Sequence, residues 1–274
     1  MWHCGKFQFN LARPLVMGIV NVTPDSFSDG GQYASSASGI AHALQLIAEG
    51  ADILDIGGES TRPGAAVVSE QEELDRVLQV IEGLRGISIP ISIDTYKPAV
   101  MRAALAAGAS MVNDINALQA DGALEAVAAS AAGICLMHKQ GAPSTMQQQP
   151  QYRDAVAEVS AFLRERIGAA VSAGITRERI VIDPGFGFGK TLAHNLDLLR
   201  ELKVFEGLGA PVLAGLSRKS MLGAITGRGV NERAAASVAA ALLAVQRGAF
   251  IVRVHDVRET VDALKIWNAV NWSE

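Results

Sequence analysis

Polar side chains stand where the short apolar runs of this 274-residue sequence stop. A strand buried on both faces gains nothing from such groups, because burying each of them unpaired costs roughly a few kcal/mol. Any one of them could be a hydrogen-bonded core group or a helix cap, but so many together indicate a shared site. In order they are Asn21, Asp55, Asp94, Asn113 with Asp114, His138, Asp183, Ser217 with Lys219, and Arg253 with His255.

The last apolar run predicts an anion site. Ile251, Arg253 and His255 alternate to the same side of a strand, so a guanidinium and an imidazole face the same way. Arg62 adds a third cation, and a planar guanidinium fork is suited to phosphate. The alternative for Arg62 is a solvated loop charge.

A second anion site is predicted where residues 215–220 turn from a strand into a helix. The backbone N–H groups of the helix start and the Ser220 hydroxyl favour a carboxylate or a phosphate. Simple capping by Ser217 is compatible with this interpretation. Lys219 is also a candidate Schiff-base lysine, whose pKa the adjacent Arg218 would lower.

Glycines dominate the segment DPGFGFGK at 183–190, which has neither the spacing of a P-loop nor that of a dinucleotide fingerprint. Glycines that let the backbone approach a flat ligand, with Phe186 or Phe188 beside it, fit the segment better. His138 and Lys139 begin a long polar segment, and we expect a mobile surface loop over residues 139–151.

The elements that must position these groups follow one repeated pattern. Eight short apolar runs, each followed by a loop and a helical pattern, predict a (β/α)8 TIM barrel of the α/β class, with a doubly wound sheet as the rival. We expect one domain over residues 1–274, with residues 1–14 as an N-terminal extension at the barrel base. Helix signals are Ser69 with Glu72, Pro98, and Asn231 as a cap. The runs are 15–20, 53–56, 89–93, 110–112, 133–137, 180–182, 211–216 and 250–254.

Composition narrows the class of partner. The net charge is −4 and Lys and Arg form no block, which argues against nucleic acid and anionic membranes. The first ten residues do not resemble a secretory signal, and no apolar stretch is long enough to span a bilayer, so we expect a cytoplasmic protein. Cys4 and Cys135 form no disulfide framework, and there is no zinc motif.

Eight blocks of the sequence resemble those of the dihydropteroate synthase family, in the same order, over about residues 15–270. The two most specific are MGIVNVTPDSFSDGG at 17–31 and DIGGESTRPG at 55–64. The others are SIDT at 92–95, VNDI at 112–115, LMH at 136–138, DPGFGF at 183–188, SRKS at 217–220 and RVHD at 253–256. Only the segment 139–151 looks idiosyncratic.

The resemblance implies that (7,8-dihydropterin-6-yl)methyl diphosphate and 4-aminobenzoate give 7,8-dihydropteroate and diphosphate, a step in folate synthesis. It implies that Asp183, Asn113 and Lys219 form hydrogen bonds with the pterin. Arg253 is expected to stack on the pterin ring and to reach the phosphate. Thr61 is expected at the pterin or the diphosphate.

The same resemblance implies Mg²⁺, held by Asn21 together with the diphosphate. Arg62, Arg253 and His255 are expected to hold the remaining phosphate charge.

Asp94 is expected to stabilise a pterin methylene cation, which makes it a catalytic residue with Lys219, Arg253 and His255. The 4-aminobenzoate carboxylate is expected at Ser220. Walls for its ring are expected from Pro24, Phe27, Pro63 and Phe188, and the first two loops are expected to exclude water.

Members of the family are usually homodimers, which is our expectation here. Three alternatives remain. A pterin-binding methyltransferase would need cobalamin, a barrel that binds pterin without catalysis would have lost rim residues, and an aldolase would form a trappable Schiff base at Lys219.

Overall fold

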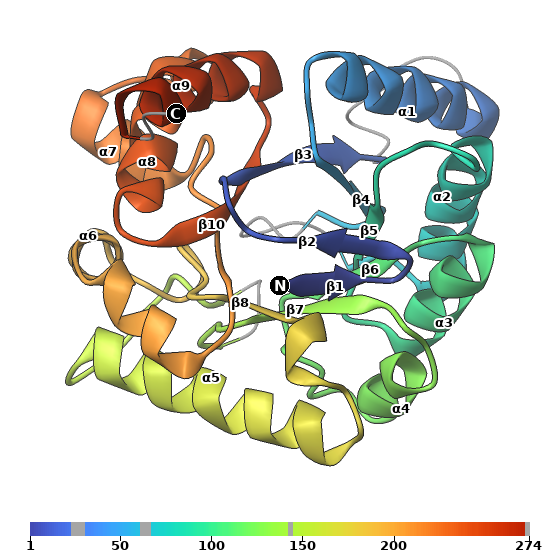
Figure 1. The fold of residues 1–274 in the computed structure, drawn as a ribbon, viewed down its shortest axis with the longest axis horizontal. Coiled ribbons are helices and arrows are strands. Elements are labelled where there is room, and N and C mark those ends of the chain that lie inside the picture. The colour runs from blue at the N-terminus through green and yellow to red at the C-terminus, as the bar shows by residue number, and fades with distance from the viewer. Residues whose placement is uncertain (23–30, 61–66, 142–144, 272–274) are drawn as a thin grey trace.

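A computed structural model describes residues 1–22, 31–60, 67–141 and 145–271 (Figure 1). Eight parallel strands close into a barrel in the order β10-β3-β4-β5-β6-β7-β8-β9, which confirms the predicted TIM barrel. All eight apolar runs became strands. They are β3 (Leu15–Asn21), β4 (Ile53–Gly57), β5 (Ile91–Asp94), β6 (Met111–Asp114), β7 (Gly133–Met137), β8 (Ile180–Asp183), β9 (Val212–Ala214) and β10 (Ala249–Val254).

Helices lie between successive strands and form the outer ring of the molecule (Figure 1). The α-helices are α1 (Gly31–Ala48), α2 (Glu70–Gly83), α3 (Pro98–Ala107), α4 (Ala123–Ala128), α5 (Ala155–Ser172), α6 (Leu192–Arg200), α7 (Ser220–Thr226), α8 (Ala234–Val245) and α9 (Val257–Asn271). Short 3-10 turns are η2 (Arg177–Arg179), η3 (Leu202–Leu208) and η4 (Val230–Glu232).

Two of the three helix signals are confirmed and one is wrong. Ser69 and Glu72 form a complete capping box before α2, and Pro98 opens α3. Asn231 does not cap α8, which begins three residues later at Ala234. The intervening residues form their own 3-10 turn, closed by the Glu232 N–H to the Gly229 carbonyl at 3.0 Å.

Inward-facing side chains of the barrel form two layers, because alternate residues of a strand point to the same face. The lower layer is apolar and includes Met17, Ile53, Met111, Val181 and Ile251. Two residues further along four of these strands, polar groups occupy the upper layer: Asp55, Asn113, Asp183 and Arg253. The outward-facing residues pack against the helices in a separate, larger core.

An antiparallel hairpin of β1 (Trp2–Cys4) and β2 (Phe7–Phe9) covers the amino-terminal ends of the strands. In Figure 1 it lies across the middle of the ring of helices. The Trp2 side chain is fully buried in the lower layer, and the Gly5 N–H donates to the Ala131 carbonyl at 3.1 Å, just before β7. The hairpin thus lies at the opposite end of the barrel from the upper, polar layer. Among the described helices, none is long and apolar enough to cross a membrane.

Candidate active site

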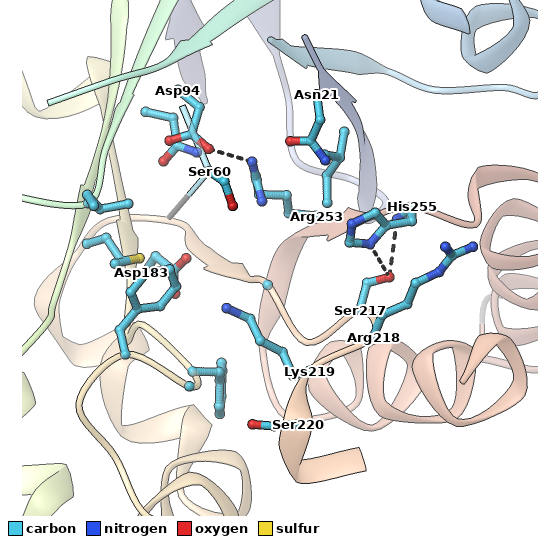
Figure 2. Close-up of a pocket in the computed structure, with 18 of the residues that line it drawn as sticks. Asn21, Ser60, Asp94, Asp183, Ser217, Arg218, Lys219, Ser220, Arg253 and His255 are labelled. Carbon is cyan, nitrogen blue, oxygen red and sulfur yellow. Dashed lines mark hydrogen bonds and ion pairs between the residues drawn. The ribbon is translucent and has the colours of Figure 1, made fainter. Parts of the chain in front are cut away.

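One cavity of about 470 Å³ opens above the upper layer, at the carboxyl ends of the strands. All the predicted site residues that the structure describes line it, and Figure 2 shows Asp94, Asp183, Lys219 and Arg253 around one space. The structure therefore brings together side chains separated by more than 200 positions in the sequence. The predicted residues along its walls are Asn21, Asp94, Asn113, Asp183, Phe188, Lys219, Ser220, Arg253 and His255.

Five predicted site residues lie outside the described residues: Pro24, Phe27, Thr61, Arg62 and Pro63. Their contributions to the aminobenzoate and diphosphate sites stay predictions from the sequence.

Arg253 is the centre of a buried charge network. Its Nε donates to Asp55 Oδ2 at 2.5 Å and its Nη2 donates to Asp94 Oδ2 at 2.6 Å, as Figure 2 shows for Asp94. The Asn113 amide also donates to Asp55 Oδ2, at 3.0 Å. The fully buried Asp55 thus fixes both the guanidinium and the amide. The sequence places Asp55 at a strand end, but it carries no sign of this role.

The network shifts the protonation equilibria of its members. Burial alone would lower the pKa of Arg253, but Asp55 and Asp94 outweigh it and raise the pKa above its ordinary value. Burial raises the pKa of Asp94 to about 7, although the Arg253 guanidinium opposes that shift. Arg253 is therefore a permanent cation, while Asp94 titrates near neutral pH.

Asp183 ends β8 and faces the cavity from the opposite wall. Its Oδ1 accepts the Gly185 N–H at 2.7 Å, so the carboxylate is oriented by the start of the glycine segment. Burial raises the pKa of Asp183, against that hydrogen bond and the Lys219 charge. Lys219 lies over the Phe188 ring, with its Nζ 4.1 Å from the ring centroid. A carboxylate and an ammonium thus flank the same part of the cavity.

Ser217 and His255 form the far side of the site, next to Asn21 (Figure 2). Ser217 Oγ lies 3.0 Å from His255 Nδ1 and also accepts the His255 backbone N–H at 3.2 Å. The capping alternative for Ser217 is wrong, because Lys219 stands at the N-cap of α7 and makes no side-chain cap bond. Ser217 instead holds the His255 imidazole.

An apolar patch lines the cavity between β6, β7 and the glycine segment, formed by Ile115, Met137, Met146 and Phe188. Three of these residues are not among the predicted site residues, since a buried Met or Ile in a sequence looks like any core residue. The patch provides a surface against which a flat apolar or aromatic group can lie.

Two further features depart from the sequence interpretation. His138 does not begin a surface loop, because it is buried and lies 3.0 Å from Lys190 Nζ. Glu59, which lines the cavity, is held by Lys97 Nζ at 2.6 Å. Both pairs join segments that follow different strands and are far apart in sequence, so no local pattern predicts them.

Comparisons with known proteins identify the family of this chain. The pterin-binding enzyme family matches residues 17–255. A dihydropteroate synthase of Neisseria meningitidis serogroup C is 53% identical, over 98% of this chain and 97% of the relative. The chain belongs to the dihydropteroate synthase family.

Solved structures of this family give the same fold. A Xanthomonas albilineans dihydropteroate synthase with 4-aminobenzoic acid superposes with a TM-score of 0.91 and 57% identity, covering 96% of this chain and 95% of the other. Another structure of that enzyme, in complex with 7,8-dihydropteroate, has a TM-score of 0.89 and 54% identity, covering 97% of each chain. The family is one of transferases in folate biosynthesis, which confirms the resemblance and the enzyme class.

Removing the Asp55 charge should destabilise the barrel. Asp55→Asn leaves the Arg253 guanidinium with one of its two carboxylates, and breaking a buried pair in this way costs about 3 kcal/mol of the free energy of unfolding. Urea denaturation measures the loss. Asp197→Asn is the matched control, because its pair with Arg200 is exposed and the change should stay below about 1 kcal/mol. Equal losses in the two variants would contradict a structural role for the buried pair.

Proposed function

We propose that this chain joins (7,8-dihydropterin-6-yl)methyl diphosphate to 4-aminobenzoate and releases 7,8-dihydropteroate and diphosphate. The observation that carries the proposal is the meeting of Asp94, Asp183, Lys219 and Arg253 at one cavity. Family relatives bind 4-aminobenzoic acid and 7,8-dihydropteroate, which supports these two compounds as substrate and product.

The pterin is recognised by the Asp183 side of the cavity. The pyrimidine edge of a pterin presents paired N–H donors, which a carboxylate accepts with two oxygens. Lys219 donates to the pterin carbonyl and ring nitrogen. The Asn113 amide, which has both a donor and an acceptor, forms hydrogen bonds with the neighbouring ring atoms. The apolar patch supports one ring face, and Arg253 lies against the other.

The diphosphate is held on the His255 side. Arg253 and His255 supply cationic or donor groups there, and Arg62 is expected to add another. Ser217 Oγ, 3.0 Å from His255 Nδ1, orients the imidazole at the cavity wall.

The residues present fit a Mg²⁺ ion that arrives with the diphosphate. Asn21 provides one neutral oxygen at the cavity wall, and the nearby carboxylates Asp55 and Asp94 are engaged by Arg253. In the described part of the chain, no group of three or more His, Cys, Asp or Glu side chains could hold the ion alone. Asn21 with phosphate oxygens would therefore hold Mg²⁺, whose chemistry is to neutralise the leaving diphosphate.

The reaction begins as the bond between the pterin methylene and the diphosphate oxygen breaks, with its electron pair leaving on oxygen. The resulting methylene cation is delocalised into the pterin, and the Asp94 carboxylate stabilises it electrostatically. The lone pair of the 4-aminobenzoate amine then forms the new C–N bond, and the amine loses a proton to solvent. Ser220 and the start of α7 hold the aminobenzoate carboxylate, with Phe188 as one wall of its ring.

Diphosphate release tests the proposal directly. The purified protein with Mg²⁺ and the pterin diphosphate should release diphosphate in step with 7,8-dihydropteroate when 4-aminobenzoate is present. Coupled phosphate detection and chromatography follow the two products. Dependence on cobalamin, or a borohydride-trapped adduct at Lys219, would contradict this function.

Asp94→Asn should lower kcat by about a hundredfold or more while the pterin dissociation constant changes less than about threefold. The amide keeps the shape of the side chain but cannot offset the methylene cation. Because the pKa of Asp94 is raised to about 7, its carboxylate is lost as the pH falls through that value. The wild-type kcat/KM should therefore have an acid limb near pH 7, which Asp94→Asn lacks.

Asp262→Asn, an exposed substitution on α9, is the control for Asp94→Asn and should match the wild type. Equal losses in kcat and in pterin affinity would contradict the charge-stabilising role of Asp94.

We also propose that the protein is a homodimer in the cytoplasm. Large apolar side chains are exposed on two helices that contact each other: Ile225 on α7 and Leu243 on α8. Exposed apolar side chains of this kind are common in the interfaces between identical subunits. Analytical ultracentrifugation should give twice the chain mass, and Leu243→Lys should shift the mass toward one chain. A wild-type mass of one chain at micromolar concentration would contradict the proposal.

A further inference from the structure

A buried lysine lies beneath the cavity and outside its lining. Lys190 ends the glycine segment that follows β8, and only 2% of its surface is exposed. Its Nζ donates to the Gly185 carbonyl at 2.9 Å and to the Phe188 carbonyl at 3.0 Å. It also lies 3.0 Å from His138 Nδ1, at the end of β7. These partners are all neutral, although a buried ammonium is ordinarily paired with a carboxylate.

His138 is suited to accept a hydrogen bond from Lys190 Nζ through its Nδ1. Burial, together with the Lys190 charge, lowers the pKa of His138 to about 3, so the imidazole is neutral at physiological pH. Burial also lowers the pKa of Lys190, to about 7, with the nearby Asp183 charge opposing the shift. An N–H donor on Nζ therefore meets the lone pair on Nδ1 whenever the protein is near neutral pH.

The glycine segment follows a path that only glycine allows. Gly185, Gly187 and Gly189 all have φ near +70°, and a Cβ on Gly185 would lie 1.8 Å from the His138 carbonyl oxygen. The segment is thus pressed directly onto the backbone that follows β7. Lys190 fixes it there by drawing two of its carbonyls toward one point.

The other side of this segment touches Lys219. The Phe188 ring lies 4.1 Å from Lys219 Nζ, and a Cβ on Gly187 would be 3.1 Å from Lys219 Cδ. A shift of the segment by a fraction of an ångström therefore moves the surface on which the Lys219 side chain rests. Asn195 holds the same segment from outside, by accepting the Gly187 N–H at 2.7 Å.

We infer that Lys190 is a positioning residue for pterin binding: it clamps the glycine segment so that Phe188 and Gly187 hold the Lys219 ammonium where it meets the pterin. Lys190 does not line the cavity, so it acts through Phe188 and Lys219 and not on the substrate. The inference rests on the proposed function, because that function supplies the pterin contact of Lys219.

Lys190→Met tests the inference, because it removes the donors and keeps most of the side-chain volume. The KM for the pterin diphosphate, and its dissociation constant by equilibrium dialysis, should rise about tenfold or more. The kcat should stay within about threefold, because the contact is made in the ground state as well as in the transition state. An unchanged pterin KM in a folded Lys190→Met protein overturns the inference.

Arg179→Met is the matched control. Arg179 donates to the carbonyls of Ala132 and Val127 at 2.7 and 3.1 Å, at the amino-terminal end of the barrel. Like Lys190→Met, the Arg179→Met variant loses a cation that binds two backbone carbonyls, but this cation lies far from the cavity. The KM of Arg179→Met for the pterin diphosphate should therefore equal that of the wild type. A similar rise in both variants would mean that general loosening of the barrel, and not the clamp, is responsible. Lys190→Gln, which keeps one donor group, serves if Lys190→Met does not fold.

A double-mutant cycle with Phe188→Leu identifies the route. If Lys190 acts through Phe188, the double variant should bind pterin no more weakly than the worse single variant. Full additivity of the two losses overturns the route through Phe188. Failure of the wild-type protein to bind the pterin diphosphate would contradict the proposed function instead, so the two hypotheses fail separately.

Discussion

The two-residue repeat of a strand is the constraint on which this active site depends. Because inward positions alternate with outward ones, each barrel strand offers one place above the apolar layer for a side chain that faces the cavity. Asn113, Asp183 and Arg253 occupy that place on β6, β8 and β10 and line the cavity, while Asp55 on β4 is fully buried and binds Arg253 and Asn113. The rigid ladder below them, sealed at its base by Trp2, fixes the distances between these groups. Loops alone would not hold four charged or polar groups at such spacing.

Placing charges inside a protein requires that each has a compensating neighbour. The structure meets this requirement in two ways. Arg253 is shared between Asp55 and Asp94, so one cation orients two carboxylates. Lys190 instead relies on carbonyl dipoles and a neutral imidazole, with Asp183 near enough to oppose the loss of its proton. The first arrangement leaves a carboxylate available at the cavity, and the second leaves the backbone of a loop fixed.

The strands and most of the site were predictable from the sequence because their signals are local. Apolar runs of the right length end at a polar residue, and this pattern identified the eight strands and the cavity-facing Asp94, Asp183 and Arg253. Pairings across the barrel give no local signal. The contact between Arg253 and Asp55 joins residues 198 positions apart, and His138 looks like part of a polar loop until Lys190 is placed beside it. The prediction that Asn231 caps α8 was wrong although its signal is local. Asn231 lies within the short 3-10 turn η4, and α8 begins only after that turn.

The charged side chains around the cavity bear on how the proposed diphosphate leaving group can be bound. On the side proposed for the pterin, Asp55 and Asp94 are paired with Arg253, and Asp183 lies near Lys219. A diphosphate that enters this space adds several negative charges. Arg218 and Arg233 line the cavity together with His255, but Arg218 is paired with Asp256, and Arg233 donates to the backbone carbonyls of Arg218 and Lys219. A carboxylate that stabilises a pterin cation, as proposed for Asp94, would also repel the leaving group. The proposed Mg²⁺, entering with the diphosphate, and the predicted contact from Arg62 would offset this repulsion and leave the proposed electrostatic role of Asp94 intact.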